Sequence, residues 1–582
     1  MDQVQKSEIL GFQNRFLSTT YKTLIPANIL IGIIVLTCAF RFFNLHFQSP
    51  WLDEISTLFD TDPNLSFSQL IDNIIHSQVH PPLYFIVTHY FMQVFGFSIE
   101  SVRFISAFFG TVSIYAYYYL GKEIFNKQVG LFSALLLSIN TGYFGYSQEG
   151  RSYTFIILLF ILSTIVFIRS VKIFSFVNLT FLTLLNVLIA YTSYFGTIFL
   201  LSQAIYLMYF LFNKEYKKFI YFSLSFIIVF VCFLPWLPNI SQGFQFEDSW
   251  IKPPTLELLR PAMNSMFPSL VLKMLVVVFF IIGLYVGLKL WIKETSILFL
   301  SFVFLIVFSF IFSYIFTPIL SWKYFIFALP GLLMIVALGL SVLGIKYLNE
   351  FLLVIFVFIS LKLTFKDFSG NYIVTKAEFR SQVELVDQAD LRIPVVMRET
   401  KVLNEYALMQ NKDIEIIATD DISKGEVDLH KRLQNGWWEL KLHRPYILDK
   451  IYNDSAFTRN FIFYDYGNFS AFRLALPKNR TLTPSEVWKI KDTTFYKFTH
   501  LGAHKIRMMV TDSSSFPHYS RNMFAFQSSV DRKFIRFAYK RSCGIHTLRT
   551  DSIGETIKIY PIIPLKQERK KGGIERIIFL KP

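Results

Sequence analysis

The sequence predicts a mainly α-helical, polytopic membrane protein that ends in a soluble domain. Of its 582 residues, 53% are hydrophobic and only 17% are charged, whereas soluble globular proteins have about 25% charged residues. The apolar residues are concentrated before Phe365 and the charged residues after it. We therefore expect a bundle of about 11 membrane spans in residues 1–365. Residues 366–582 should form a soluble domain that passes from α/β to mostly β structure.

Eleven apolar windows are candidates for these spans. A helix needs about 20 apolar residues to cross the hydrocarbon core of a bilayer. The windows lie at 24–46, 103–121, 129–146, 153–168, 174–193, 195–212, 219–238, 271–290, 296–316, 324–344 and 350–365. A polar segment precedes the first window and no small-residue cleavage site follows it, so we interpret it as a retained span and not as a signal peptide.

The polar connectors between the spans predict the orientation. One alternating set is rich in Lys and Arg: Lys6/Arg15/Lys22, Lys122/Lys127, Arg169/Lys172, Lys214/Lys217/Lys218, Lys289/Lys293 and Lys346. Cytoplasmic loops of membrane proteins collect such residues. We therefore expect a multi-pass protein of the plasma (inner) membrane, with its N-terminus in the cytoplasm and its C-terminal domain outside.

The segment Pro81–Phe97 is also apolar, but counting it as a span would place every later basic connector outside. We therefore interpret it as a juxtamembrane helix within a long external loop, residues 47–102. The net charge of +16 fits basic loops and lipid phosphates, and no nucleic-acid module is recognisable. The three cysteines, Cys38, Cys232 and Cys543, give neither a disulfide framework nor a zinc-binding spacing.

The C-terminal region reads as an ordinary soluble sequence. An amphipathic helix is expected at Lys376–Asp390. Strands are expected at Ile393–Met397, Ile414–Ala418, Phe461–Tyr466, Phe469–Leu476, Val487–Lys491, Lys505–Val510, Lys533–Tyr539, Ile557–Ile563 and Ile577–Leu580, because these runs alternate or are aromatic. No spacing in the region is characteristic of a catalytic motif.

Charged residues gather in the loops that should face outward. The first loop contains Trp51-Leu52-Asp53-Glu54, then Asp60 and Asp62, then His80-Pro81-Pro82-Leu83-Tyr84; Arg103, Glu149, Arg151 and Lys323 follow in or beside later loops. Each has a structural interpretation: the acids as solvated side chains, His80-Pro81-Pro82 as a helix start, Glu149 and Arg151 as an ion pair, Arg103 as an interfacial anchor, and Lys323 as a side chain that reaches the interface.

A functional interpretation joins these residues. Carboxylates and cations at one membrane face suit the transfer of a group from a lipid-linked phosphate. A carboxylate can take the proton of an acceptor hydroxyl, and Arg, Lys or a metal ion can stabilise the charge on the departing phosphate. The hydrophobic tail of the donor can meanwhile stay in the bilayer.

The ordered set of motifs resembles the GT-C glycosyltransferase superfamily, in the branch that contains protein O-mannosyltransferases and the lipid A aminoarabinose transferase. The matching segments are Trp51–Glu54, His80–Tyr84, Arg103, Leu120–Phe125, Ser147–Tyr153 and Tyr191–Phe195. Together they place the resemblance over residues 24–345. It implies a GT-C-type bundle and a polyprenyl-phosphate sugar as the donor, with a lipid, a glycan or a protein as the acceptor.

The resemblance also implies roles for particular residues. Asp53 would be the catalytic base, with Glu54 beside it and Glu149 completing the site. Arg151, Arg103, Lys323 and His80 would bind the donor phosphate, and Trp51, Tyr84, Tyr153 and Tyr194 would position the substrates. No cofactor is certain, because some members bind a divalent metal (Mg or Mn) and others do not; where one is bound, Asp53 and Glu149 would be its ligands. Gly150 and Lys323 depart from the common pattern, and Lys in place of Arg loses the bidentate fork.

Two other functions compete with this hexosyl- or pentosyltransferase. A transporter or flippase of lipid-linked sugars would place binding groups near the bilayer midplane, where this sequence has only a few neutral residues, such as Asn186 and Gln203. A scaffold protein would not need the acidic pairs. The sequence does not specify the sugar, the acceptor, the oligomeric state or the role of the C-terminal domain.

Overall fold

A computed structural model describes residues 26–78, 80–240, 251, 253–342 and 348–364. Further along, it describes the short stretches 383, 386–387, 392–397, 400–409, 412–418, 433–435 and 437–442, and seven strands between 457 and 577. The chain divides into two compact units. The membrane unit consists of residues 1–46 and 56–366, and the C-terminal unit consists of residues 47–55 and 367–582.

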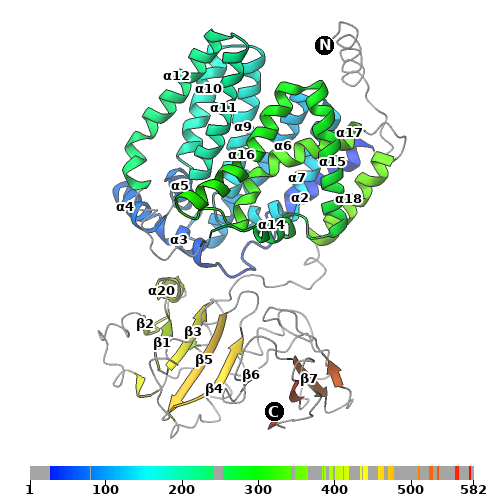
Figure 1. Ribbon diagram of the computed structural model, residues 1–582. Helices are drawn as coiled ribbons and strands as arrows, with labels where there is room; N and C mark the ends of the chain where they lie inside the picture. The colour runs from blue at the N-terminus through cyan, green and yellow to red at the C-terminus, as the bar shows by residue number, and fades with distance from the viewer. Residues whose placement is uncertain are drawn as a thin grey trace. The chain divides into compact units, whose positions relative to one another are not determined.

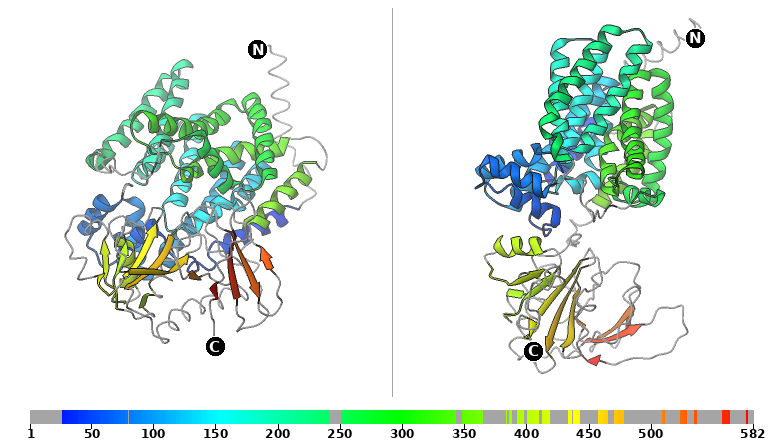
Figure 2. Two further views of the ribbon diagram at one scale, coloured as in Figure 1. Left: turned by 60° about the horizontal axis from the view of Figure 1, so that its bottom comes forward. Right: turned by 60° about the vertical axis from the view of Figure 1, so that its left-hand side comes forward.

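The membrane unit is a helical bundle (Figures 1 and 2). Its elements are α2 (Ala27–Phe40), α3 (Leu52–Asp60), α4 (Phe67–Ser77), α5 (Leu83–Phe95), α6 (Ile99–Ile124), α7 (Lys127–Ser138), α8 (Thr141–Ser147), α9 (Tyr153–Lys172), α10 (Phe176–Ala190), α11 (Tyr194–Phe212), α12 (Tyr216–Phe233), α14 (Leu259–Met266), α15 (Leu270–Leu290), α16 (Ile292–Ile315), α17 (Leu329–Val342) and α18 (Leu348–Thr364). The short 3₁₀ helices η1 (Leu234–Asn239), η2 (Leu256–Leu258) and η3 (Trp322–Ala328) interrupt it.

Each of the eleven expected spans contains a helix, so the prediction of a polytopic helical bundle is confirmed. Within the described residues, six helices are long and apolar enough to cross a membrane, or seven if the bent pair α7–α8 forms one span. The windows at 24–46, 174–193 and 350–365 hold the shorter apolar helices α2, α10 and α18. The window at 103–121 holds α6, which carries charged residues near both ends. That these four also cross the membrane stays a prediction.

The helices differ in how far the protein itself buries them. About nine-tenths of the η3–α17 segment (89%) and 83% of α9 are buried inside the bundle, whereas α12 and α15 are each only 28% buried. The exposed residues of α12 and α15 are mostly large and apolar, including Ile227, Phe230 and Val278. Because lipid is as apolar as these side chains, α12 and α15 form the lipid-facing periphery, and α9 and α17 form the core.

Local sequence explains where the juxtamembrane helices begin and end. Ser66 and Gln69 form a reciprocal capping box at the start of α4, an arrangement that satisfies two backbone donors at once. Pro82 precedes α5, and Gly96 ends it with a φ of 93°, a conformation that glycine adopts without steric cost. At 13 residues, α5 is about 20 Å long, too short to span the bilayer upright. The segment Pro81–Phe97 thus contains one short helix, and its place in an external loop stays a prediction.

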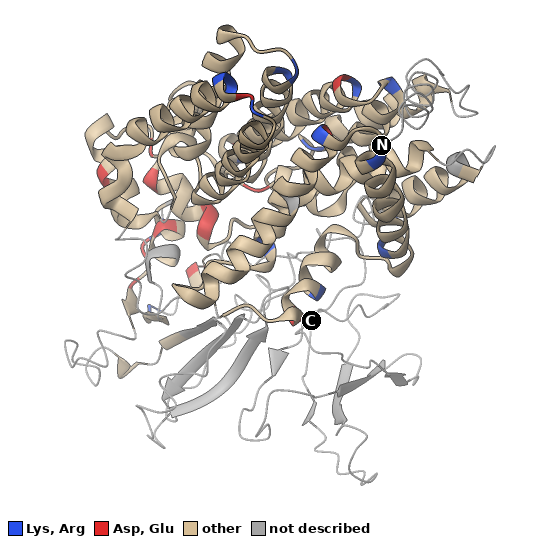
Figure 3. Ribbon diagram, turned by 45° about the horizontal axis from the view of Figure 1, so that its top comes forward, with Lys and Arg blue, Asp and Glu red and all other residues tan. Residues whose placement is uncertain are grey.

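The basic connectors meet at one end of the bundle. Arg169 at the end of α9 forms an ion pair with Glu123 at the end of α6, and Lys172 pairs with Glu294 at the start of α16. Lys218 near the start of α12 donates to the carbonyl of Val171. Figure 3 shows Lys and Arg gathered mainly along this end of the membrane unit. The four basic connectors between α6 and α7, α9 and α10, α11 and α12, and α15 and α16 therefore lie together, as the sequence predicts. The other two, Lys6/Arg15/Lys22 and Lys346, lie outside the described residues.

The C-terminal unit contains α20 (Thr400–Met409) and two sheets. The first has the order β2-β1-β3-β5-β4-β6, from β1 (Val395–Met397), β2 (Ile416–Ala418), β3 (Trp437–Leu442), β4 (Phe457–Tyr464), β5 (Ser470–Pro477) and β6 (Met509–Val510). β1 runs parallel to β2 and β3, and the remaining pairs are antiparallel. The second, antiparallel sheet has the order β10-β9-β7-β8, from β7 (Met523–Ser528), β8 (Phe534–Arg536), β9 (Ile557–Ile562) and β10 (Arg576–Ile577).

The expected passage from a mixed to a mostly antiparallel β piece agrees with these sheets. The sequence missed β3, whose Trp437 and Trp438 are buried, and β7. The expected strand at Val487–Lys491 and most of the expected helix at Lys376–Asp390 lie outside the described residues.

Close backbone packing joins α15 to α17. A methyl group added at Gly283 would lie 1.9 Å from the carbonyl oxygen of Ile335, and one added at Gly339 would lie 2.0 Å from that of Phe279. Gly283 and Gly287 are four residues apart on α15, the spacing that brings transmembrane helices into close contact. Neither backbone can move away without separating the helices, so side chains are excluded here.

Gly283→Ala should therefore destabilise the membrane unit. Overpacking of this kind costs about 1–3 kcal/mol, and we expect a lower melting temperature of the detergent-purified protein, measured by loss of the monodisperse chromatographic peak after heating. Gly32→Ala in α2 is the matched control, because a methyl group there meets nothing within 4 Å. Equal melting temperatures for the two variants would show that the α15–α17 contact is looser than described.

Candidate active site

Arg151 is the centre of a polar cluster in the membrane unit. Its side chain is buried, with 7% of the residue exposed. Its Nη1 atom donates to Thr57 Oγ1 at 2.7 Å and to Gln78 Oε1 at 3.3 Å, and its guanidinium lies 5.8 Å from the ring centroid of Phe85. Ser106 of α6 donates to its backbone carbonyl at 3.0 Å. The loop between α8 and α9, here called the second loop, is thus fastened to α3, to the end of α4 and to α6.

Asp60 belongs to the same cluster, and the sequence analysis gave it no role. This buried acid, 4% exposed, accepts hydrogen bonds from Ser77 Oγ at 2.5 Å and Gln78 Nε2 at 2.6 Å. Gln78 therefore bridges Asp60 and Arg151, one through each end of its amide. Thr57, Ser77 and Gln78 were also missed. The sequence feature that could have pointed to Asp60 and Gln78 is that each lies at the end of a helix, α3 or α4, within the first loop.

His80 lies beside Arg151 and is electrically neutral. The residue is half-buried, but its Nδ1 atom is fully buried and has no hydrogen-bond partner among the described residues. Burial, reinforced by the positive charge of Arg151, lowers the pKa of His80 from 6.5 to about 3, because both disfavour the imidazolium. His80 can therefore offer a hydrogen bond to a phosphate but no positive charge at neutral pH.

A broken helix carries the second loop into this cluster. α7 and α8 meet at a bend of 65°, where Asn140 caps α8 by accepting from the backbone of Tyr143 and donates to the carbonyl of Met266. Such breaks are tolerated in membrane proteins only where other groups satisfy the freed backbone. The loop Gln148–Arg151 follows α8 directly.

Arg41 of α2 stabilises the broken helix from its other side. It is fully buried and donates to the carbonyl of Ser138 at the end of α7 (2.9 Å) and to Ser147 Oγ at the end of α8 (3.3 Å). Its guanidinium also lies 5.2 Å from the ring centroid of Phe144. Gln148 in turn donates to three carbonyls at the end of α2, those of Phe40, Arg41 and Phe43. Hydrogen bonds from Arg41, at the end of α2, and from Gln148, in the second loop, thus connect the start of this loop to the end of α2.

Glu149 lies between these anchors. It is half-buried, and the amide of Arg151 donates to its carbonyl at 2.7 Å, so the two residues form one tight turn. Glu149 is therefore held by its neighbours on both sides. Its predicted role in the site stays a prediction.

Asp53, Glu54 and Trp51 group with the C-terminal unit, so their predicted meeting with Glu149 and Arg151 in one pocket stays a prediction. Glu54 is buried and accepts from the backbone amide of Trp51 at 3.4 Å, which caps the start of α3. Asp53 is half-buried in the same first turn, a favourable place for a carboxylate because of the helix dipole. Asp53 is therefore the more accessible acid of the pair.

The other residues with a predicted role in donor binding or substrate positioning each have their own neighbours. Tyr84 is buried, and its hydroxyl lies 3.1 Å from Ser106 Oγ. Tyr153 packs against Tyr146 and Phe327, and Tyr194 accepts a hydrogen bond from Trp236. Arg103 is 1% exposed and donates to the carbonyl of Leu45. Lys323 is half-buried at the start of η3, next to Tyr324, which packs on Phe195.

Comparison with known proteins agrees with this architecture. Residues 79–239 match the family model described as dolichyl-phosphate-mannose-protein mannosyltransferase. No curated protein matches the chain in sequence. Among solved structures, ArnT from Cupriavidus metallidurans in the apo state aligns with a TM-score of 0.50 at 10% identity, covering 77% of this chain and 98% of that chain. The membrane unit has the GT-C fold.

Two further solved structures are similar at lower scores. ArnT from Cupriavidus metallidurans bound to undecaprenyl phosphate aligns with a TM-score of 0.49 at 10% identity, over 78% of this chain and 99% of that one. The archaeal oligosaccharyltransferase AglB from Archaeoglobus fulgidus, in complex with an inhibitory peptide and a dolichol-phosphate, aligns with a TM-score of 0.43 at 9% identity, over 95% and 97%. The resemblance to the GT-C superfamily that was read from the motifs is confirmed by the family match and the fold.

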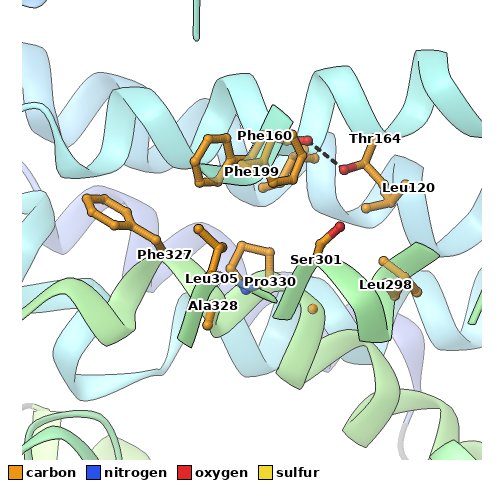
Figure 4. A pocket seen from close by; sticks show the side chains of 12 residues that line it. Leu120, Phe160, Thr164, Phe199, Leu298, Ser301, Leu305, Phe327, Ala328 and Pro330 are labelled. Carbon is orange, nitrogen blue, oxygen red and sulfur yellow. Dashed lines mark hydrogen bonds between the residues drawn. The ribbon is translucent and has the colours of Figure 1, made fainter. Parts of the chain in front are cut away.

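The helical bundle contains an apolar crevice, whose lining side chains are drawn in Figure 4. Its lining comes from α6, α9, α11, α16, η3 and α17 and includes Leu120, Phe160, Phe199, Leu305 and Phe327. The hydroxyls of Thr164 and Ser301 in its wall bond to carbonyls of their own helices, so they offer little to a polar ligand. The crevice is therefore apolar and offers no charged group to a ligand.

Among the described residues, no three His, Cys, Asp or Glu side chains gather closely enough to hold a metal ion. Asp53 and Glu149, the ligands expected for one, lie in different units, so their joint role stays a prediction.

Neutral His80 gives the protein a specific acid sensitivity. An unfolded chain takes up a proton at His80 near pH 6.5, whereas the folded protein takes it up only near pH 3. Acidification between these values therefore favours the unfolded state, and stability rises again as the pH rises. We expect the melting temperature of His80→Gln to fall less than that of the wild type between about pH 7.5 and about pH 5.

His76→Gln is the control for this comparison, because His76 is an exposed histidine on the neighbouring helix α4. It should follow the wild-type curve. If His80→Gln also follows the wild-type curve, the pKa of His80 is the same in the folded and the unfolded protein, and His80 is not the source of the acid sensitivity.

Proposed function

We propose that this protein is an integral membrane glycosyltransferase that moves a sugar from a polyprenyl-phosphate donor to an acceptor on the outer face of the membrane. The observation that carries the proposal is the Arg151 cluster, in which a buried guanidinium from the second loop is fixed against the first loop by Thr57 and Gln78. Support comes from the GT-C fold and from the mannosyltransferase family model that matches residues 79–239. ArnT and AglB are described with undecaprenyl phosphate and dolichol-phosphate, respectively.

In the proposed reaction, an oxygen of the acceptor forms a bond to the anomeric carbon of the sugar. The bond between that carbon and the phosphate oxygen breaks, and the pair of electrons leaves with the polyprenyl phosphate. The acceptor's proton passes to the carboxylate of Asp53, which is more accessible than Glu54. Arg151 stabilises the charge that develops on the phosphate, as a fixed donor does in a buried site.

The membrane geometry supports this assignment of the donor. The Lys- and Arg-rich connectors meet at one end of the bundle, which we assign to the cytoplasm by the positive-inside rule. The backbone amide of Leu83 donates to the carbonyl of Tyr191, which brings the first loop to the connector between α10 and α11, a connector outside the Lys- and Arg-rich set. The donor headgroup would then lie at the outer face, and its chain would remain in lipid or enter the apolar crevice of Figure 4.

The transporter alternative receives less support from the same structure. The neutral polar residues inside the bundle are occupied with one another: Ser163, Asn186 and Gln203 form a closed ring of hydrogen bonds across α9, α10 and α11, with lengths of 2.7, 3.3 and 2.9 Å. Such a ring stabilises the packing of the three helices. It leaves few groups that could bind a headgroup in transit.

Asp53→Asn should abolish transfer and leave the protein in the membrane. A general base contributes about 10²–10⁴-fold to the rate, and we expect a loss of this size in the transfer of labelled sugar from a polyprenyl-phosphate donor to acceptors in membrane vesicles. Asp72→Asn is the control, since Asp72 is an exposed acid in the same loop. Normal turnover by Asp53→Asn would remove Asp53 from the role of base.

Arg151→Met should weaken donor binding, because a charge-assisted bond to a phosphate is worth about 1.5–3 kcal/mol. This corresponds to a rise of about 10–100-fold in the KM for the donor, and Arg151→Lys should fall in between because it keeps the charge and loses the fork. Thr57→Val removes the hydrogen bond between Thr57 and Arg151 but keeps the guanidinium. It therefore distinguishes the effect of holding Arg151 in place from the effect of its charge. Arg169→Met, at the other end of α9, is the distant control. An unchanged KM in Arg151→Met would exclude it from phosphate binding.

A further inference from the structure

The short segment that carries Asp53 is structurally part of the C-terminal unit. Residues 47–55 group with residues 367–582, although they lie more than 300 residues away in the chain and the membrane unit surrounds them in the sequence. The segment contains the whole Trp51–Glu54 motif and the first turn of α3. Compact grouping of this kind means that the backbone of the segment lies close to that of the C-terminal unit.

One hydrogen bond within that unit marks the attachment. The hydroxyls of Ser49 and Tyr406 lie 3.1 Å apart, and both residues are buried, with 1% and 2% exposed. Hydroxyls withdrawn from water are costly to leave unbonded, so this contact selects one position of Ser49. Tyr406 lies on a helix, α20, that packs on β2, and its neighbours Leu403 and Ala407 on that helix are also buried.

The chain between Ser49 and Asp53 is stiff enough to transmit this constraint. Pro50 fixes its own φ and restricts the backbone of Ser49 to extended conformations. Trp51 then begins α3, where its amide is capped by Glu54, and Asp53 lies within the first turn. Few freely rotating bonds therefore separate the anchored hydroxyl of Ser49 from the backbone of Asp53.

We propose that the C-terminal unit positions the catalytic base, and that Tyr406 is a positioning residue that acts through Ser49. The inference rests on the proposed role of Asp53. Because a displacement of about 1 Å in a reacting group can cost about 10²-fold in rate, losing the anchor affects the chemical step. Donor binding depends on Arg151 in the membrane unit and is left unchanged.

The test uses the full-length protein with Tyr406→Phe, Ser49→Ala and the double variant. Each single variant removes one hydroxyl and little volume. We expect kcat for sugar transfer to fall about 10-fold or more in either, with the KM for the donor unchanged, and no further loss in the double variant because both remove the same bond. Leu408→Ala, an exposed position on the same helix (68% exposed), should leave kcat unchanged.

A second measurement does not depend on activity. Hydrogen exchange of peptides covering residues 47–55, followed by mass spectrometry, should become faster in Tyr406→Phe and Ser49→Ala but not in Leu408→Ala. If Tyr406→Phe does not fold, the smaller change Ser49→Ala gives the same reading. Faster exchange with unchanged kcat would overturn the positioning role, and unchanged exchange would overturn the anchor itself. Full activity of Asp53→Asn would instead refute the proposed function, while the exchange result would still decide whether the anchor exists.

Discussion

The hydrogen bonds of Arg151 are the constraint on which the polar end of the membrane unit depends. They connect segments that are far apart in the chain: the second loop, α3, and the end of α4. Arg151 is buried, so its guanidinium must have its donors satisfied, because an unpaired buried charge is very costly. Thr57 and Gln78 accept from it, and Asp60 is linked to it through Gln78. The cluster therefore fixes the relative positions of these loops more strictly than apolar packing alone.

The same logic applies on the bilayer side of the cluster. The bend between α7 and α8 frees backbone groups within an apolar bundle, and Arg41 and Asn140 bond to the ends of both helices. Gln148 then bonds three carbonyls at the end of α2. Polar side chains inside a membrane protein are rare and usually functional. Here they hold an irregular backbone in place so that the loop from Gln148 to Arg151 leaves the bundle at one defined point.

The sequence predicted the helices of the membrane unit well, because long apolar runs and alternating basic connectors are local signals. Charge placement also set Pro81–Phe97 apart from the predicted spans. The resemblance to GT-C enzymes came from short local motifs, such as His80-Pro81-Pro82. Arg151 belongs to one of these motifs, and it lies at the centre of the polar cluster.

What the sequence could not provide was the set of partners that complete each motif. Thr57, Ser77 and Gln78 are ordinary residues of helices or their ends, and nothing in their spacing shows that Arg151, more than 70 residues later, will bond to two of them. In the same way, Trp437 and Trp438 of β3 were missed because a strand depends on distant pairing with β1 and β5. The grouping of residues 47–55 with the C-terminal unit is likewise a long-range property.

Helix α3 connects these observations, because it is shared between the two units. Its first turn, with Asp53 and Glu54, groups with the C-terminal unit, and its last residues, with Thr57 and Asp60, group with the membrane unit. A nine-residue helix is only about 13 Å long, so its own hydrogen bonds do little to fix its orientation. Contacts made by its second half do so instead: Thr57 accepts from Arg151, and Asp60 accepts from Gln78. The Arg151 cluster therefore holds the last turns of α3 within the membrane unit more firmly than the short helix could hold itself.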